Sequence, residues 1–124
     1  MKEMLLPVLL GDGIGLIRSI AAIGQSDGVV PLALTLHSHP FLPAIFPVRV
    51  RRLAKEELPF LCDLLASIAE AEEDRILCLV PCTPDFRRFV EENRRFLEEY
   101  YICAKTNDPM GIPFCRVPTG RRQE

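Results

Sequence analysis

The feature that most constrains the fold of this chain is an alternation of short apolar runs with amphipathic helical patterns. Apolar runs occupy residues 5–10, 29–36 and 75–81, and their lengths suit strands that are covered on both faces of a sheet. Apolar residues at helical spacing follow the first run from residue 13 and the last run from residue 84. The alternation predicts an α/β fold: a small Rossmann-like three-layer domain with a mostly parallel sheet of about four strands.

Proline and arginine modify the expected strands. Pro7 lies inside the first apolar run and counts against a fully paired central strand, because proline has no N–H to donate. A short, half-exposed edge strand is expected at residues 46–50, where valine alternates with arginine. The cluster of Arg49, Arg51 and Arg52 could attract an anion or the acidic surface of a partner. The interpretation we favour is a charged edge that discourages pairing with another sheet.

Two further helices are expected, and three prolines predict a loop at residues 37–47. One helix begins between Lys55 and Pro59 and runs to about residue 72. Its expected buried stripe consists of Leu58, Leu61, Cys62, Leu65, Ile68 and Ala69. The other helix begins with Thr83 as N-cap and Pro84 at the first position. It pairs arginine with glutamate four residues apart on its outer face and ends near residue 102.

Length and composition limit the domain organisation and the classes of function. The 124 residues provide for one core, which we place at residues 1–102, followed by an irregular tail at residues 103–124. The net charge of −2 and the pI of about 5.7 give no basic field for nucleic acid or an anionic membrane. No apolar run approaches the ~20 residues of a membrane span. Five cysteines without regular spacing favour reduced thiols and a cytoplasmic protein.

A glycine turn joins the first apolar run to the first helix. Gly11, Gly13 and Gly15 lie where the N–H groups of a helix N-terminus can meet a phosphate. The dinucleotide fingerprint requires Gly-x-Gly-x-x-Gly and an acidic residue about 20 residues later. Here Leu16 occupies the third glycine position, and Asp12 within the turn would repel a pyrophosphate. We therefore expect the glycines to permit a tight turn, and we expect no cofactor in this chain.

Two histidines and a cysteine are the other candidates for chemistry. His37 and His39 follow the second apolar run, where α/β sheets place ligands. With Cys82 or Asp85 they would make a metal site, although a solvated pair of loop histidines is the simpler interpretation. Cys82 precedes a helix N-terminus, whose dipole lowers a thiol pKa, but no second cysteine stands at redox spacing. The sequence therefore assigns neither a catalytic residue nor a metal site.

Two segments resemble the ATP-grasp carboxylate–amine ligases, a group that includes enzymes similar to D-aspartate ligase. The first follows the glycine turn and resembles the family's Gly-Leu-x-x-x-Arg-Ser-Leu-like helix; it reads Gly13-Ile14-Gly15-Leu16-Ile17-Arg18-Ser19-Ile20. The second runs from Ile76 to Tyr101 and is similar to the family's strand-Pro-x-x-Asp segment with a later Asn-Arg-x-x-Leu, through Pro81, Asp85 and Asn93. The resemblance covers residues 5–102 and implies the N-terminal, pre-ATP-grasp domain.

The resemblance implies a domain that is not catalytic alone and forms one wall of a substrate cleft. ATP and magnesium would be bound by an ATP-grasp domain or partner chain, since the sequence departs from the family after residue 102. The residues that it places near the substrate are Gly11, Asp12, Gly13, Ile14, Ser38, Cys82, Thr83 and Asp85. The alternative is a stand-alone Rossmann-like binding or regulatory module that self-associates. Both interpretations predict an exposed apolar patch and a homo-oligomer.

Overall fold

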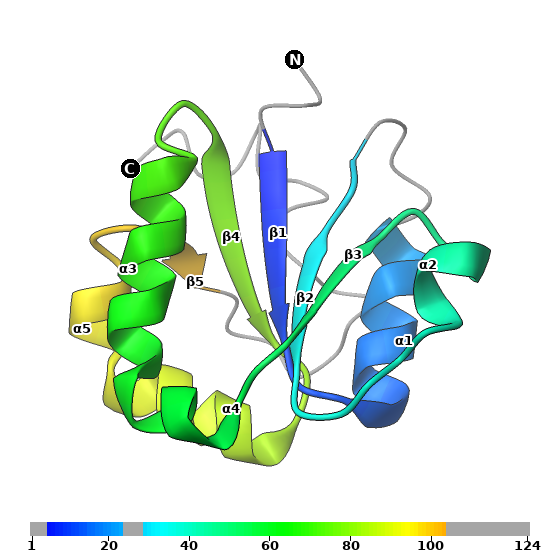
Figure 1. Cartoon of the computed structure of the whole chain (residues 1–124). Coiled ribbons are helices and arrows are strands. Elements are labelled where there is room, and N and C mark those ends of the chain that lie inside the picture. Colours follow the sequence, from blue (N-terminus) through cyan, green and yellow to red (C-terminus); the bar gives the residue numbers. More distant parts are fainter. Residues whose placement is uncertain (1–4, 24–28, 104–124) are drawn as a thin grey trace.

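Five parallel strands form one sheet in the order β3-β2-β1-β4-β5 (Figure 1). The computed structural model describes residues 5–23 and 29–103. Its strands are β1 (Leu5–Leu10), β2 (Leu32–Thr35), β3 (Arg49–Arg52), β4 (Ile76–Pro81) and β5 (Ile102–Cys103). The predicted α/β class and Rossmann-like architecture are confirmed, and every pair of neighbouring strands is parallel. The expected number of strands is one too few, because the two residues of β5 are too short to show a strand pattern.

Helices cover both faces of the sheet. Their bounds are α1 (Gly13–Ile23), α2 (Leu42–Ile45), the 3-10 helix η2 (Lys55–Phe60), α3 (Leu61–Ala71), α4 (Pro84–Glu92) and α5 (Arg94–Leu97). Helices α1 and α2 lie on one face, and α3, α4 and α5 lie on the other (Figure 1). A cluster of buried hydrophobic side chains fills each interface, so the sheet is the middle of three layers.

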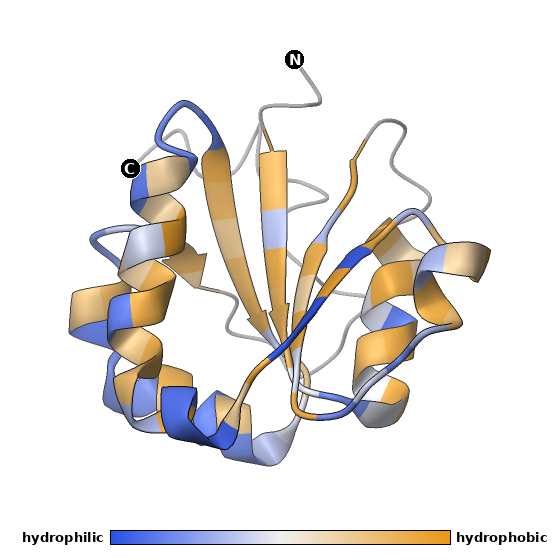
Figure 2. Cartoon of the chain, viewed as in Figure 1, coloured by the Kyte–Doolittle hydropathy of each residue, from blue (hydrophilic) through white to orange (hydrophobic). Residues whose placement is uncertain are grey.

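The central strand β1 is apolar at every position because it is covered on both faces. Leu6, Val8 and Leu10 belong to the cluster under α3, α4 and α5, whereas Leu9 belongs to the cluster under α1. Both β1 and β4 are hydrophobic along most of their length (Figure 2). Full burial of each leucine stabilises the fold by about 1.5–3 kcal/mol. A strand with alternating polar residues could not occupy this central place.

Pro7 lies within β1, so the expectation that it disfavours a central strand is wrong. The hydrogen bonds of a parallel strand point alternately to its two neighbours. The N–H of Gly11 donates to the carbonyl of Leu34 in β2 at 3.0 Å, and by this alternation the nitrogen of Pro7 also faces the β2 side. Pairing with β2 begins only at Val8. The missing N–H of Pro7 therefore removes no bond between strands.

The short strand β3 is an edge strand, as predicted, although it lies at Arg49–Arg52 instead of residues 46–50. Its three arginines are exposed and give it a hydrophilic stretch in Figure 2. Val50 is half-buried and packs against the cluster under α1. A short, charged edge of this kind resists pairing with a second sheet.

The segments on either side of β3 correct three expectations. Strand β2 is shorter than the predicted residues 29–36, because Pro31 cannot donate to a ladder. The loop predicted at residues 37–47 contains the single turn α2. The second helix begins as the 3-10 helix η2, and the α-helical part α3 starts only after Pro59. Leu61, Leu65 and Ala69 are buried as expected, whereas Leu58 is 36% exposed.

The last predicted helix is interrupted at Asn93 and does not continue to residue 102. Asn93 has φ −117° and ψ 19°, which is outside the helical region. Its side-chain amide donates to the carbonyl of Phe89 at 2.8 Å. An asparagine side chain that bonds the nearby backbone competes with the helix. The chain then forms the short α5 and turns into β5.

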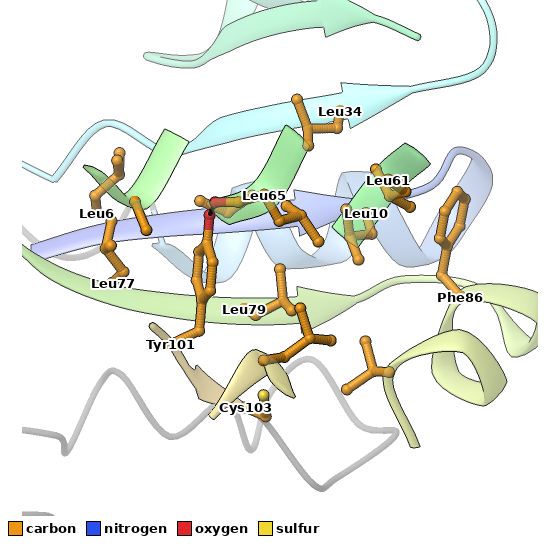
Figure 3. Packing of buried hydrophobic residues seen from close by; sticks show 14 of the residues in the cluster. Leu6, Leu10, Leu34, Leu61, Leu65, Leu77, Leu79, Phe86, Tyr101 and Cys103 are labelled. Atoms are coloured by element: carbon orange, nitrogen blue, oxygen red, sulfur yellow. Dashed lines mark hydrogen bonds between the residues drawn. The ribbon is translucent and has the colours of Figure 1, made fainter. Parts of the chain in front are cut away.

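Tyr101 fixes the turn between α5 and β5. Its hydroxyl donates to the carbonyl of Leu65 in α3 at 2.7 Å, and its ring lies in the core (Figure 3). On the outer surface, the predicted pair of Arg94 and Glu98 is present at 3.0 Å. The hydroxyl of Tyr101 thus ties the end of the described chain to α3.

The expected division of the chain at residue 102 falls within β5. Residues 104–124 of the expected tail lie outside the described residues. No helix in the described part of the chain has the length and apolar character needed to cross a membrane.

Candidate functional site

Asp12 joins the carboxyl ends of β1 and β2. It follows β1 in the glycine turn, and its carboxylate accepts hydrogen bonds from the N–H groups of Leu36 at 2.9 Å and His37 at 3.3 Å. The Nε2 atom of His39 lies 2.5 Å from Asp12 Oδ1. The loop after β2 is thereby held against the turn that opens α1.

Asp12 and His39 form a carboxylate–imidazole pair at the edge of the sheet. Partial burial raises the pKa of Asp12, but the hydrogen bonds from His39, Leu36 and His37 outweigh this and lower the pKa below its ordinary value of 3.8. An ionised carboxylate fixes the orientation and tautomer of a histidine ring. The pair can therefore orient a polar ligand group or pass a proton through the second ring nitrogen, Nδ1.

The sequence analysis missed this pair, although a signal for it was present. An acidic residue directly follows one buried strand, and a histidine follows the next strand along the chain. The carboxyl ends of neighbouring parallel strands meet at the same edge. The prediction treated Asp12 as a source of repulsion for phosphate and as a residue near the substrate, but it did not connect Asp12 with His39, and it considered His37 and His39 together. The structure instead separates the two histidines: His39 contacts Asp12, and the side chain of His37 is exposed.

The glycine turn is packed closely against the turn that follows β4. Gly11 has φ +117°, and a Cβ atom there would lie 2.8 Å from Thr83 Cγ2. A Cβ atom on Gly15, in the first turn of α1, would collide with the carbonyl oxygen of Cys82. The N–H of Gly11 is already donated to the carbonyl of Leu34. Gly11 thus makes room for the side chain of Thr83 and Gly15 for the backbone of Cys82, which supports their interpretation as residues of a tight turn.

Thr83 and Cys82 have contacts that support the fold. The Thr83 hydroxyl accepts the N–H of Phe86 at 3.3 Å, so Thr83 is the N-cap of α4 as predicted. Cys82 Sγ lies 3.7 Å from Ser19 Oγ in α1. Burial raises the pKa of the Cys82 thiol to about 11, which corrects the expectation that the helix dipole lowers it. Desolvation outweighs the dipole here, so the thiol stays protonated at neutral pH.

The remaining predicted site residues point to solvent. Gly13 and Ile14 are exposed at the start of α1, and Ser38 is exposed in the loop between the two histidines. The side chain of Asp85 is 91% exposed and pairs with Arg88 at 3.7 Å. Of the residues predicted to lie near a substrate, the structure brings together Gly11, Asp12, Cys82 and Thr83. Ser38 is carried by the adjoining loop, and Asp85 is directed away from this cluster.

The two histidines do not meet a third metal ligand. In the described ranges, no three His, Cys, Asp or Glu side chains are close enough to hold a metal ion. The combination of His37 and His39 with Cys82 or Asp85 is therefore not assembled. The residues face different surroundings: His39 contacts Asp12, whereas Asp85 is exposed on the outer surface of α4.

A surface hollow of about 630 Å³ opens beside this cluster, at the carboxyl ends of β2 and β3. It is lined by Leu36, His37, Arg52, Leu53, Ala54, Lys55 and Leu58. The sequence analysis did not locate it. An anion was considered there for the arginine cluster, but the pattern did not show which of the three arginines faces a concavity.

No known protein family matches this chain, and neither does any curated protein or solved structure. Function is therefore argued from the residues of the site.

Proposed function

We propose that this chain is a pre-ATP-grasp-like domain, not catalytic alone, that forms one wall of the substrate cleft of an ATP-dependent carboxylate–amine ligase. The proposal rests on the carboxyl end of the sheet, where the pair of Asp12 and His39 lies and where the segments after β1 and β3 carry exposed apolar side chains. Ile14, which follows β1, is 69% exposed, and Phe60, which follows β3, is 63% exposed. A polar centre with an apolar rim is the surface expected where a second domain closes over a substrate.

The proposal assigns ATP and magnesium to an ATP-grasp domain or partner chain. It is supported by the closed packing of Gly11 on Thr83 and Gly15 on Cys82, since such a turn gives a phosphate little access. The side chains that would face the substrate are Asp12, Ile14 and Ser38. We also propose a cytoplasmic location, which is supported by the free thiols of Cys62, Cys82 and Cys103.

A thermal-shift titration of the purified chain tests this function. The ligands are magnesium-ATP, NADH and a panel of amino acids as acceptor substrates. We expect the melting temperature to rise with one class of amino acid and to stay unchanged with either nucleotide, because binding to the folded state stabilises it by mass action. Stabilisation by magnesium-ATP or NADH would contradict the assignment of nucleotide binding to a partner. A chain that responds to no amino acid would contradict the substrate wall.

A second candidate function is a stand-alone module that self-associates. Phe41 is 75% exposed and Ile45 is 68% exposed, and α2, which Phe41 precedes, packs beside the edge strand β3 (Figure 1). Light scattering during size-exclusion chromatography separates the two candidates. A dimer that Ile45→Asp dissociates would favour the module, whereas a dimer dissociated only by Phe60→Asp would place the interface at the carboxyl end of the sheet.

A further inference from the structure

We propose that the hollow at the carboxyl ends of β2 and β3 binds a small organic anion, with a carboxylate or phosphate group next to an apolar part. Its volume of about 630 Å³ lies within the range of roughly 300–1,000 Å³ that small-molecule sites occupy. We call it the anion hollow. The inference does not depend on the ligase proposal, because it is argued only from lining residues in the described part of this chain.

Two cationic side chains line the anion hollow. Arg52 donates from Nε to the carbonyl of Leu36 at 3.4 Å, which leaves the terminal nitrogens of its guanidinium for other acceptors. Lys55 follows at the start of η2. Among the described residues, neither Arg52 nor Lys55 is paired with a carboxylate. Two unpaired cations at one concave surface attract an anion, and a guanidinium binds carboxylate or phosphate with two parallel hydrogen bonds.

Two carboxylates next to residues that line the anion hollow, Glu57 and Asp12, are engaged with partners other than Arg52 and Lys55. Glu57 accepts from Arg51 at 2.7 Å and from the N–H of Ala54 at 2.8 Å. Asp12, on the other side of the loop, is bound to His39 and to two backbone N–H groups. Arg51 is thus neutralised by Glu57, whereas Arg52, the next residue along β3, faces the anion hollow. The alternation of side chains along a strand separates the two arginines.

Apolar side chains also line the anion hollow, beside His37, and define the second half of the ligand. Leu53 is buried, Leu36 is half-buried, and Leu58 is 36% exposed. Leu58 occupies a position in the predicted buried stripe, yet it lies open to solvent beside Lys55 in the same hollow. An apolar group that covers Leu36 and Leu58 would gain burial that a bare inorganic ion cannot provide. This argues for an amphipathic anion in preference to free phosphate.

Nuclear magnetic resonance titration of the full chain tests the proposal with four probes. Phenylacetate and phenyl phosphate carry the two candidate acidic groups, phenylacetamide is the neutral analogue of the first, and inorganic phosphate lacks the apolar part. We expect phenylacetate or phenyl phosphate to shift the amide signals of residues 36–37 and 52–58, with a Kd on the order of 1 mM. The tighter of the two identifies the acidic group. Binding should weaken as salt is added, because exposed charges are screened.

Three variants with the same change of charge make the test specific. Arg52→Gln and Lys55→Gln should each raise the Kd by roughly tenfold, because each removes a charge-assisted hydrogen bond. Arg49→Gln is the matched control, since Arg49 is an exposed arginine of β3 that does not line the anion hollow. Equal Kd values for the wild type and Arg52→Gln would overturn the proposal. So would equal binding of phenylacetamide, or the absence of any shift with either organic anion. If inorganic phosphate bound as tightly as phenyl phosphate, the claim that the ligand has an apolar part would be overturned.

Discussion

Two parts of the carboxyl edge of the sheet are built in opposite ways. Between β1 and β4 the turns are packed together, with Gly11 against the side chain of Thr83 and Gly15 against the backbone of Cys82. At β2 and β3 the edge opens into the anion hollow. The usual ligand crevice of such a sheet lies where the order of strands reverses, which is here between β1 and β4. The difference shows that topology marks a candidate place for a ligand, whereas side-chain packing decides whether the place is open.

The largest effect is expected for Gly15→Ala in the closed part. Alanine favours a helix over glycine by up to about 1 kcal/mol, so helix propensity alone predicts stabilisation. The new Cβ atom would meet the backbone carbonyl of Cys82, which cannot move aside as a side chain can. We expect a loss of about 3 kcal/mol in the free energy of unfolding, measured with urea. A stabilised variant would show that the two segments are not in contact.

Gly11→Ala should lower the free energy of unfolding somewhat less, by about 2 kcal/mol. A non-glycine residue at φ +117° is strained, and its Cβ atom would approach Thr83. The second cause can be separated from the first. Thr83→Ser keeps a hydroxyl for the N-cap of α4 and removes the Cγ2 methyl group. Gly11→Ala should therefore be less harmful in a Thr83→Ser background. Identical losses in both backgrounds would leave only the backbone strain.

Asp12→Asn tests the hydrogen bonds that link the closed part to the loop after β2. We expect the free energy of unfolding to fall by about 1.5 kcal/mol at neutral pH. Because the folded-state pKa of Asp12 is lowered below 3.8, ionised Asp12 stabilises the fold above that pH. The contribution is lost as the pH falls from about 3.8 through the lower folded value. In urea unfolding, the difference in free energy of unfolding between the wild type and Asp12→Asn should therefore shrink as the pH falls through this range. Asp74→Asn, at an exposed turn, is the control for the loss of one carboxylate and should keep the wild-type free energy of unfolding at neutral pH.

The smallest effect is expected in the open part. Arg52→Gln should change the free energy of unfolding by no more than about 0.5 kcal/mol, because the side chain is exposed and has no carboxylate partner among the described residues. Chemical denaturation measures this value. A loss comparable to that of Gly11→Ala would mean that Arg52 supports the fold and would remove the contrast between the two parts.

The class of fold could be predicted from the sequence because β1 and β4 are continuously apolar and α4 begins with a strong cap. Element boundaries were harder where one residue changes the outcome. The side chain of Asn93 ends a helix that the spacing of apolar residues would continue. The two edge strands showed little apolar strand pattern in the sequence, since β5 has two residues and β3 is mostly arginine.

The candidate site was predicted in its position along the chain and not in its contacts. The resemblance groups the turns after β1, β2 and β4 around one substrate, but the bonds from Asp12 to His39 and to the loop after β2 depend on which strands lie side by side. The direction of the pKa shift of Cys82 was misjudged because its burial against Ser19 comes from α1, which is far from it in sequence. The anion hollow needs the bend between β3 and η2, which no local pattern encodes.

The position of Pro7 has a consequence for how the strands find their alignment during folding. In the native register its nitrogen points toward β2 before β2 begins. If β1 shifted by one residue in either direction, that nitrogen would face β4, and a carbonyl of β4 would lose its donor at a cost of about 1–3 kcal/mol. Parallel strands of uniform leucine and valine have few other ways to tell one alignment from the next. Pro7, which lowers the strand propensity of this segment, thus favours the native register of β1 over registers shifted by one residue.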